Sequence, residues 1–356
     1  MKKSQNVTFS DIAKYTNFSK TTISRYFNNP DSLTSENQKI IADALVQLNY
    51  QENKVARILA NGRTEFVGII IPNLYLDYYS EMLDQILLTY ENYGYKFLVF
   101  IGNEEEETER RYIQELMAYK IEGLIVLSHT IPSQELAELH IPIVAIERED
   151  LFVSSVNTDN YAGATRAMEL LSEHGCEVMI HINSPTKESI PAYDRQRGFI
   201  DYCKSHNLPN QVFVRDMGTC YEQNEKALSD ILTSIEAAFP RRRKGIFVTN
   251  DIYTNILLNL LFRKYGRLPD NYYLVGFDNS PISRQAILPI STVSQQIEQI
   301  AREAMRLLVS QMEARKKGTP SPIAEPIHKT VEPILLRRAT TEKSHSPSGQ
   351  CPEAED

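Results

Sequence analysis

Hydroxyl and cationic side chains crowd one short segment of the chain, residues 19–25, with the sequence Ser-Lys-Thr-Thr-Ile-Ser-Arg. An arginine can bond guanine O6 and N7 together, and hydroxyls can reach bases or phosphates. On the outer face of a helix, these side chains could therefore read the major groove of double-stranded DNA. A solvated helix face is the alternative. The candidate DNA-contacting residues of this region are Ser19, Lys20, Thr21, Thr22, Ser24, Arg25 and Asn28.

Short helices are expected around this segment. Thr8-Phe9-Ser10-Asp11 is a capping-box pattern, which places a helix start near Thr8. Thr8 is also a candidate for DNA contact. Ser19 can cap a second helix, and Ser35-Glu36-Asn37-Gln38 is a second capping box before an apolar helical stripe. The turn Thr16-Asn17-Phe18 joins the first two helices, so the pattern predicts a helix-turn-helix scaffold.

The charge distribution supports a nucleic-acid partner for this head alone. Residues 1–63 contain nine Lys and Arg against five Asp and Glu, an excess of four positive charges. Because the whole chain has a net charge of -8, the remainder carries -12. A basic head on an acidic body predicts that only the head meets a polyanion.

The segment that follows the head, residues 53–63, alternates cations with small and apolar residues. Such a segment suits a wedge in the minor groove, although a plain linker helix packed on the body is the alternative. It is too short to be a stable helix alone in water. Its candidate DNA-contacting residues are Ala56, Arg57 and Leu59.

From Phe66 onward, short apolar runs alternate with longer amphipathic stretches. This rhythm predicts parallel strands with crossover helices, an α/β doubly wound fold, and eight or more units favour two lobes. The runs are 66–71, 96–101, 123–127, 141–146, 178–182, 212–214, 245–249 and 273–277. The expected organisation is a DNA-binding domain (1–50), a hinge helix or linker (51–64), a body (65–338) and a disordered tail (339–356). The first lobe is expected over 65–160 and 291–322, and the second over 161–290 and 323–338.

The composition excludes several classes of protein. Hydrophobic residues make up 42% and charged residues 24%, the globular range, and no apolar run approaches the roughly 20 residues that span a bilayer. The N-terminus lacks the apolar core of a signal peptide, so a cytoplasmic location without a membrane partner is expected. The four cysteines form no C-x-x-C, and no metal site is expected.

At this point the sequence resembles the lactose/galactose repressor family of bacterial transcription regulators, over essentially residues 7–338. The resemblance rests on motifs in both head and body that follow one another in register. They are Val7–Ala13, Ser19–Arg25, Leu48–Tyr50, Val55–Arg57, Phe66–Pro72, Thr158–Asn160, Arg195–Phe199, Thr249–Asp251, Gly276–Asp278 and Ser291–Val293.

The resemblance implies a homodimer on a palindromic operator, with Lys20, Thr21 and Arg25 at base-contacting positions. It makes Leu59 the residue that wedges into the minor groove, with Ala56 packing beside it. The family often has Pro before the Asn at position 53, where this chain has Glu52. No leucine heptad follows residue 338, so a tetramerisation tail is not expected.

The body then resembles periplasmic sugar-binding proteins, with a ligand held between two lobes. A doubly wound fold places ligands beyond the carboxyl ends of strands, and a planar Arg opposite an Asp can grip vicinal hydroxyls. Helix capping is the alternative role for the acids. The resemblance implies ligand-lining positions at Tyr78, Tyr79, Arg195, Tyr221 and Ile297. Together with Asp159, Asn250 and Asp278 they are the expected effector-binding residues.

The sequence therefore predicts a repressor of a carbohydrate-utilisation operon whose effector is a sugar, sugar phosphate or sugar acid, with no cofactor. A global carbon regulator with a phosphorylated carrier protein as co-effector is the alternative within the family. A sugar-binding protein without a DNA role would leave residues 1–63 unexplained. An enzyme is not expected, because no glycine-rich phosphate loop, paired catalytic carboxylates or nucleophile elbow is visible.

Overall fold

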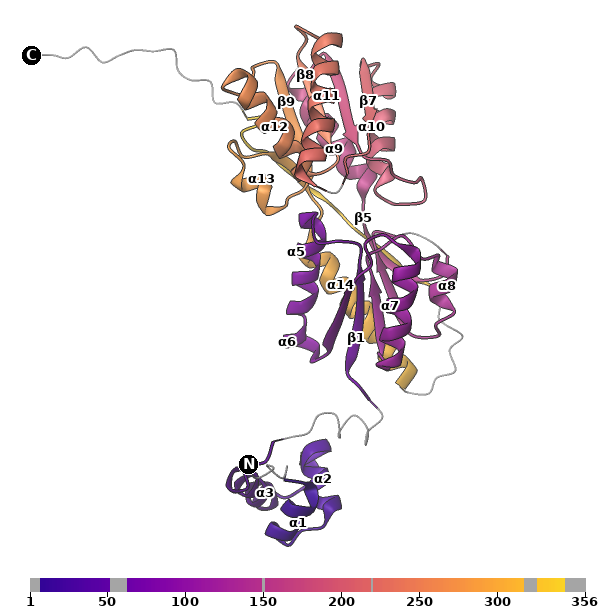
Figure 1. Cartoon of the computed structure of the whole chain (residues 1–356), viewed down its shortest axis with the longest axis vertical. Coiled ribbons are helices and arrows are strands. Elements are labelled where there is room, and N and C mark those ends of the chain that lie inside the picture. Colours follow the sequence, from indigo (N-terminus) through magenta and orange to yellow (C-terminus); the bar gives the residue numbers. More distant parts are fainter. Residues whose placement is uncertain (1–6, 52–62, 149–150, 219, 317–324, 343–356) are drawn as a thin grey trace, which may run out of the picture. The chain divides into compact units, whose positions relative to one another are not determined.

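The computed structural model describes residues 7–51, 63–148, 151–218, 220–316 and 325–342. The chain divides into two compact units, Met1–Arg63 and Thr64–Asp356. Figure 1 shows a small helical head in the first unit and two sheets with helices on their faces in the second. The expected combination of an all-helical head with a two-lobed doubly wound α/β body is confirmed.

The head is built from α1 (Phe9–Thr16), α2 (Lys20–Asn28) and α3 (Ser35–Gln47). Its core consists of Ile12, Ile23, Ile41 and Ala44, which are buried where the three helices meet. Asn17 ends α1 with a φ of 60°, a left-handed conformation that asparagine tolerates and that turns the chain toward α2. The helix-turn-helix expected from the sequence is therefore present.

The helix starts in the head are fixed by side-chain caps. The Asp11 carboxylate accepts hydrogen bonds from the N–H and the hydroxyl of Thr8, at 2.9 and 2.7 Å. Ser19 Oγ accepts the N–H of Thr22 at 3.1 Å. The third cap is Thr34, one residue before the expected Ser35, since its hydroxyl accepts the N–H of Asn37.

The body contains two six-stranded sheets, one in each lobe. The order of the first is β11-β5-β4-β3-β1-β2 and that of the second is β12-β10-β9-β8-β6-β7. Every neighbouring pair is parallel except β10 and β12. The first sheet comprises β1 (Phe66–Ile71), β2 (Lys96–Ile101), β3 (Gly123–Val126), β4 (Ile143–Ile146), β5 (Ser154–Thr158) and β11 (His328–Val331). The second comprises β6 (Val178–Asn183), β7 (Asn210–Val214), β8 (Lys244–Val248), β9 (Tyr272–Asp278), β10 (Ser291–Ser294) and β12 (Ile334–Leu336).

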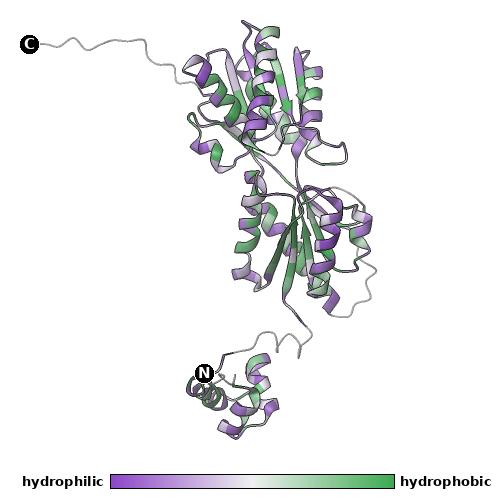
Figure 2. Ribbon diagram, in the orientation of Figure 1, coloured by the Kyte–Doolittle hydropathy of each residue, from purple (hydrophilic) through white to green (hydrophobic). Residues whose placement is uncertain are grey.

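Helices cover both faces of each sheet, so the central strands are apolar on both sides, as the hydropathy colouring of Figure 2 shows. In the first lobe the helices are α5 (Asp77–Leu88), α6 (Tyr90–Tyr93), α7 (Glu106–Ala118), α8 (Ser133–Ala137) and α14 (Ile297–Lys316). In the second they are α9 (Asn160–Glu173), α10 (Tyr193–Ser205), α11 (Tyr221–Ala238), α12 (Asp251–Tyr265) and α13 (Pro281–Gln285).

Within the described residues the chain crosses between the lobes at three places: after β5, after β10 and after β11. The expected lobe boundaries are wrong in two of these places. Residues 291–294 form β10 of the second sheet instead of opening the first-lobe segment, and residues 328–331 form β11 of the first sheet. Both strands are short and rich in hydroxyls or charge, which hides them from an apolar pattern.

The expected disordered tail begins too early. Thr340 and Thr341 are buried, and the Thr340 hydroxyl donates to the Leu274 carbonyl at 2.8 Å. Residues 339–342 are therefore part of the second lobe, held by hydrogen bonds that a search for an apolar face does not detect.

Helices α9 and α10 approach each other closely at Gly198. A Cβ at this position would lie 2.9 Å from the Tyr161 carbonyl oxygen and 3.0 Å from Ala164 Cβ. We therefore expect Gly198→Ala to push α10 away from α9 and lower the free energy of unfolding by about 1–3 kcal/mol. Urea unfolding would measure this, with Gln196→Ala on the same helix as the control. An unchanged midpoint for Gly198→Ala would contradict the close packing that positions α10.

Candidate functional site

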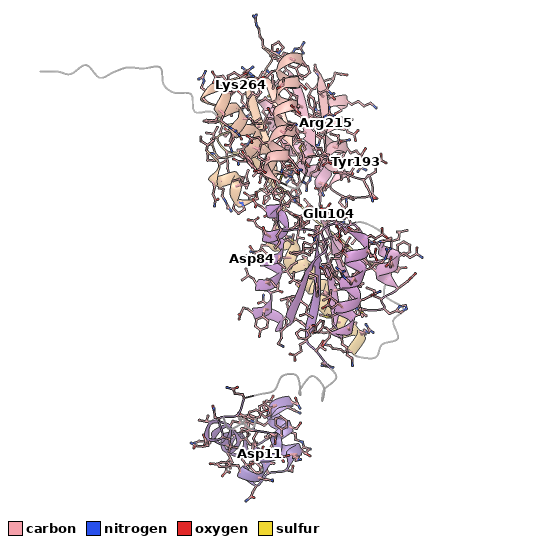
Figure 3. The ribbon with its side chains drawn as sticks, in the orientation of Figure 1. Asp11, Asp84, Glu104, Tyr193, Arg215 and Lys264 are labelled. Atoms are coloured by element: carbon pink, nitrogen blue, oxygen red, sulfur yellow. The ribbon has the colours of Figure 1, made fainter. Side chains whose placement is uncertain are left out.

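A cavity of about 560 Å³ lies between the lobes, where parallel strands of both sheets end. Figure 3 labels Glu104 at this edge of the first lobe. Five of the eight residues expected to bind an effector line the cavity: Tyr78, Tyr79, Arg195, Asn250 and Asp278.

The guanidinium of Arg195 is fixed from several sides. Its Nε donates to Asn160 Oδ1 at 2.7 Å and its Nη1 to the Thr249 carbonyl at 2.8 Å. The Cζ atom lies 3.8 Å from the centre of the Phe277 ring, a cation–π distance. Because α10 begins two residues earlier, the helix delivers this buried cation directly to the cavity wall.

Asp278 ends β9 and faces Arg195, with 3.8 Å between Asp278 Oδ1 and Arg195 Nη1. The side chain of Gln295 donates a hydrogen bond of 2.5 Å to the same carboxylate oxygen. Burial raises the pKa of Asp278 to about 7, although the Arg195 cation and the Gln295 hydrogen bond oppose that rise. The carboxyl group can therefore donate or accept hydrogen bonds near neutral pH.

The Arg195–Asp278 pair belongs to a closed ring of buried side chains. Thr158 Oγ1 donates to Gln295 Oε1 at 2.7 Å, and the Thr158 N–H donates to Glu147 Oε1 at 2.5 Å. The Asn160 amide donates to Glu147 Oε2 at 2.8 Å, and Asn160 in turn accepts from Arg195. The ring includes residues at two of the interlobe crossovers, so hydrogen bonds connect the cavity to the connections between the lobes.

Two tyrosines form an aromatic wall of the cavity. The rings of Tyr78 and Tyr79 meet edge to face, with 5.3 Å between their centres. Burial raises the pKa of both hydroxyls, so they are neutral and can donate. Within the described residues the Tyr78 hydroxyl is buried without a hydrogen-bond partner. A buried hydroxyl in this state calls for a partner from a bound molecule or water.

Asn250 both caps a helix and lines the cavity. Its Oδ1 accepts the N–H of Tyr253 at 2.8 Å and so caps α12, while the residue also lines the cavity. Asp159 only caps a helix: its Oδ1 accepts the N–H of Ala162 at 2.8 Å, and the residue does not line the cavity. Tyr221 is 43% exposed and lies beside Arg263 on the second lobe, also away from the cavity.

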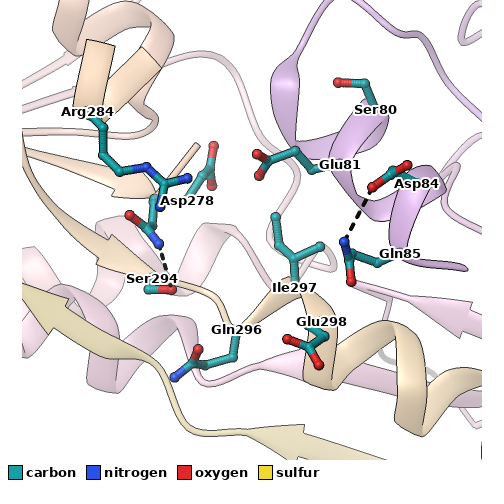
Figure 4. Close-up of a pocket in the computed structure, with 11 residues that line it drawn as sticks. Ser80, Glu81, Asp84, Gln85, Asp278, Arg284, Ser294, Gln296, Ile297 and Glu298 are labelled. Carbon is teal, nitrogen blue, oxygen red and sulfur yellow. Dashed lines mark hydrogen bonds between the residues drawn. The ribbon is translucent and has the colours of Figure 1, made fainter. Parts of the chain in front are cut away.

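Ile297 lines a second cavity, of about 490 Å³, on the α5 side of the crossovers. Figure 4 shows Glu81 of the first lobe and Arg284 of the second on opposite sides of it. Burial raises the pKa of Glu81, and the Arg284 charge opposes this rise. Ile297 is therefore not brought together with Arg195 in the 560 Å³ cavity.

Several polar residues of the cavity were missed by the sequence reasoning. Most of them lie after strands or near helix starts of the first lobe, two lie in the loop after β6, and Gln295 follows β10 of the second sheet. The rule that ligands bind beyond strand ends could have indicated these positions. Burial lowers the pKa of His129 to about 4, helped by the charges of Arg148 and Lys187, so this imidazole is neutral at pH 7. The missed residues are Glu104, Glu106, His129, Thr130, Glu147, Ser184, Lys187 and Gln295.

In the head, some side chains of α2 and its cap form hydrogen bonds within the helix, and others are exposed and available to contact DNA. The hydroxyls of Ser19 and Thr22 bond each other at the cap, and Ser24 Oγ accepts from the Asn28 amide at 3.1 Å. Lys20, Thr21 and Arg25 are exposed on the same helix, and among the described residues their side chains form no hydrogen bond or ion pair. Ala56, Arg57 and Leu59 lie outside the described residues.

No helix in the described ranges is long and apolar enough to cross a membrane. Over the same ranges, no group of three or more His, Cys, Asp or Glu side chains could hold a metal ion.

Comparison with known proteins agrees with this architecture. Residues 8–53 match the model of the bacterial regulatory proteins of the lacI family. Residues 64–240 match the periplasmic binding proteins and sugar-binding domain of the LacI family, and residues 168–341 match a periplasmic binding protein-like domain.

Among curated relatives, the ribose operon repressor of Halalkalibacterium halodurans is 30% identical, over 88% of this chain and 92% of that protein. The sucrose operon repressor of Streptococcus mutans is 25% identical, over 85% of this chain and 92% of that protein.

Among solved structures, a Lac repressor dimer bound to operator and an anti-inducer superposes with a TM-score of 0.80. Its sequence identity is 19%, with coverage of 95% of this chain and 99% of that one. A LacI-type regulator from Alkaliphilus metalliredigens, complexed with D-xylulofuranose, has a TM-score of 0.65 and 25% identity. That match covers 77% of this chain and 98% of the regulator. Head, body and relatives together identify the chain as a member of the lacI family of bacterial regulatory proteins, a DNA-binding transcriptional repressor and not an enzyme.

Proposed function

We propose that this protein represses an operon for the use of a neutral sugar, which binds in the 560 Å³ cavity and changes operator affinity. The observation that carries the proposal is the buried Arg195–Asp278 pair facing that cavity from the second lobe. A planar guanidinium beside a carboxyl group offers donors and acceptors at the spacing of neighbouring hydroxyls. The Tyr78 and Tyr79 rings can cover the C–H face of a sugar from the first lobe.

The charges of the cavity favour a neutral sugar over a sugar phosphate or sugar acid. Four carboxyl side chains line it, against two cationic ones. Of the two cations, Arg195 already faces Asp278, and Lys187 is exposed at the rim. A phosphate or carboxylate ligand would therefore enter a region of like charge. The carboxyl side chains are those of Glu104, Glu106, Glu147 and Asp278.

The names of the relatives agree with a sugar effector. Two curated relatives are repressors of ribose and sucrose operons, and a structural neighbour is complexed with a sugar. The cavity volume of about 560 Å³ admits a pentose, a hexose or a disaccharide. D-ribose, sucrose and cellobiose are therefore suitable first probes.

The exposed side chains of α2 support the proposed reading of DNA. Lys20 and Thr21 stand in the first turn of the second helix of a helix-turn-helix, the part that meets base edges. Arg25 lies on the same exposed face one turn later. The proposal includes minor-groove contacts by Ala56, Arg57 and Leu59, on the resemblance alone.

A homodimer on a palindromic operator is part of the proposal. Edge strand β2 and the adjoining helices expose several large apolar side chains, a feature of surfaces that pair. These are Leu87 and Leu88 at the end of α5, Tyr90 of α6 and Val99 of β2.

A thermal-shift screen tests the effector class. D-ribose, sucrose and cellobiose would be compared with ribose 5-phosphate and gluconate on wild type and Arg195→Met. A ligand at 100 times its dissociation constant stabilises a protein by about 2.7 kcal/mol, a shift that is easily measured. We expect a neutral sugar to stabilise wild type and not the variant. Stabilisation by the charged compounds alone would overturn the proposed effector class.

A further inference from the structure

The last described residues, Arg338–Glu342, pack on the second lobe and will be called the C-terminal strap. The Thr340 side chain accepts the N–H of Ser291, and its hydroxyl donates to the Leu274 carbonyl. The Thr341 and Ser291 hydroxyls bond at 2.6 Å. The strap is thereby fixed across β9 and β10, the strands that lead to the cavity.

The strap directs the guanidinium of Arg338 toward the loop that follows Asp278. One nitrogen donates to Asn279 Oδ1 at 2.6 Å, and the other donates to Ser283 Oγ at 2.9 Å and to the Ile290 carbonyl at 3.0 Å. A single side chain therefore joins the residue after Asp278 to α13 and to the start of β10.

The loop held by Arg338 has an unfavourable backbone conformation. The unfavourable residue is Asp278, with a φ of 108°, whereas Asn279 has a φ of 59°, a left-handed conformation that asparagine tolerates. A residue such as Asp278 keeps this conformation when surrounding contacts fix it. Two further anchors act on the backbone: the Asn279 N–H donates to Thr292 Oγ1, and the Ser280 N–H donates to Asp251 Oδ2 at 2.9 Å. Arg338 holds the Asn279 side chain at Oδ1 at 2.6 Å, while the Asn279 amide makes a longer bond of 3.5 Å to Ser294 Oγ.

We infer that Arg338 is a positioning residue for the effector cavity: through Asn279 and α13 it holds Asp278 in the conformation that faces Arg195. The inference rests on the proposed function only in that Asp278 contacts the sugar. No described atom of Arg338 lines the 560 Å³ cavity, so its effect is exerted through the loop.

Two neighbouring arginines give a matched pair of variants. Arg338→Met removes the three hydrogen bonds and keeps the aliphatic stem. Arg337→Met is the control, because the Arg337 guanidinium points away to Glu173 and Glu342 with 48% of its side chain exposed. Arg338→Lys keeps the charge near Asp251 but cannot bond Asn279, Ser283 and Ile290 together, so it serves if the Met variant does not fold.

The first measurement is amide hydrogen exchange in the sugar-free protein. We expect Arg338→Met to speed exchange of the amides of Asn279 and Ser280 roughly ten-fold, with the first lobe unchanged. Arg337→Met should match wild type. Exchange equal to wild type in the Asn279–Ser280 segment, or equally faster over the whole second lobe, would overturn the positioning role.

The second measurement is calorimetric binding of D-ribose, sucrose and cellobiose, with operator affinity measured without sugar. We expect the sugar that binds wild type to bind Arg338→Met roughly ten-fold more weakly, while operator binding stays unchanged. Equal sugar affinity in wild type and Arg338→Met would refute the inference. If no probe binds wild type, the proposed effectors fall, and hydrogen exchange still decides whether Arg338 holds the loop.

Discussion

Arg195→Met should abolish the response to sugar while leaving sugar-free operator binding intact. The substitution removes the donor to Asn160 and to the Thr249 carbonyl, and it leaves the buried Asp278 without its cation. Truncating one member of a buried, hydrogen-bonded charge pair costs about 2–5 kcal/mol, so we expect sugar affinity to fall roughly thirty-fold or more. Calorimetry with the sugar found in the screen, and operator affinity with and without it, measure the effect.

The chain supplies a matched control on the same helix. The Arg197 guanidinium points outward, where it meets Asp194 at 3.2 Å and lies over the Tyr161 ring. Arg197→Met should bind sugar as wild type does. Arg195→Lys keeps the charge but not the planar fork, and we expect it to resemble Arg195→Met. A response to sugar at wild-type concentrations in either Arg195 variant would show that this cavity does not hold the effector.

Lower stability is the other consequence of removing Arg195. Without the Arg195 cation the pKa of Asp278 rises further and its carboxyl group becomes neutral, but Asn160 Oδ1 and the Thr249 carbonyl lose their buried donor, at about 1–3 kcal/mol each. Each variant must therefore be shown to be folded by circular dichroism at the temperature of the binding assay. Reciprocal coupling supplies an internal check. If sugar weakens operator binding in wild type, operator must weaken sugar binding by the same factor, and both effects must vanish together in Arg195→Met.

The central strands that the sequence predicted share one property, a mostly apolar run between two layers of helices. β1 reads Phe-Val-Gly-Ile-Ile-Ile and is almost wholly buried, so its composition alone indicates a central parallel strand. β5 and β10 read Ser-Ser-Val-Asn-Thr and Ser-Thr-Val-Ser and are also buried. Their hydroxyls are satisfied by distant residues, as when Ser291 bonds Thr341, and such pairing cannot be read locally.

The residues of the candidate site also fall into those that the sequence could predict and those that it could not. Asn250 and Asp278 were predictable because each lies at a strand end, where a doubly wound fold places ligands. Arg195 lies in the first turn of α10 and was predictable from the resemblance of the Arg195–Phe199 motif. Glu147 follows a strand as well, but its role depends on Thr158 and Asn160 across a crossover, and no sequence spacing indicates that contact. Asp159 and Ile297 lie beside crossovers too, yet one caps a helix and the other faces the second cavity. Position near a crossover does not determine which way a side chain points.

The closed ring of buried side chains explains why the Arg195–Asp278 pair and the interlobe crossovers should move together. Gln295 connects Asp278 to Thr158, and Glu147 connects Thr158 to Asn160. A sugar that draws Asp278 or Arg195 toward itself changes hydrogen bonds on two crossing segments at once. Because buried polar networks have discrete arrangements, this provides a physical route from the cavity to the angle between the lobes.

Arg25→Ala should cause a comparably large loss of operator binding by the head. Arg25 is exposed on α2, and its side chain makes no hydrogen bond or ion pair with the described residues, so it is free for DNA. A lost bidentate contact to guanine costs about 1–3 kcal/mol, and a dimer on a palindrome loses it twice. Operator affinity should therefore fall steeply while sugar binding in the absence of DNA is unchanged. Fluorescence anisotropy with labelled operator measures the first quantity and calorimetry the second.

The salt dependence of binding distinguishes the kinds of contact that Arg25 could make. A base contact predicts a large loss on the operator, a small loss on unrelated DNA and relaxed preference at one base pair of each half-site. A phosphate contact predicts equal losses on both DNAs and a salt slope lower by about one for each copy of Arg25. Lys39→Ala, which removes an exposed cation of α3, is the matched control for charge alone. If Arg25→Ala weakens operator binding no more than Lys39→Ala does, α2 is not the helix that reads the operator.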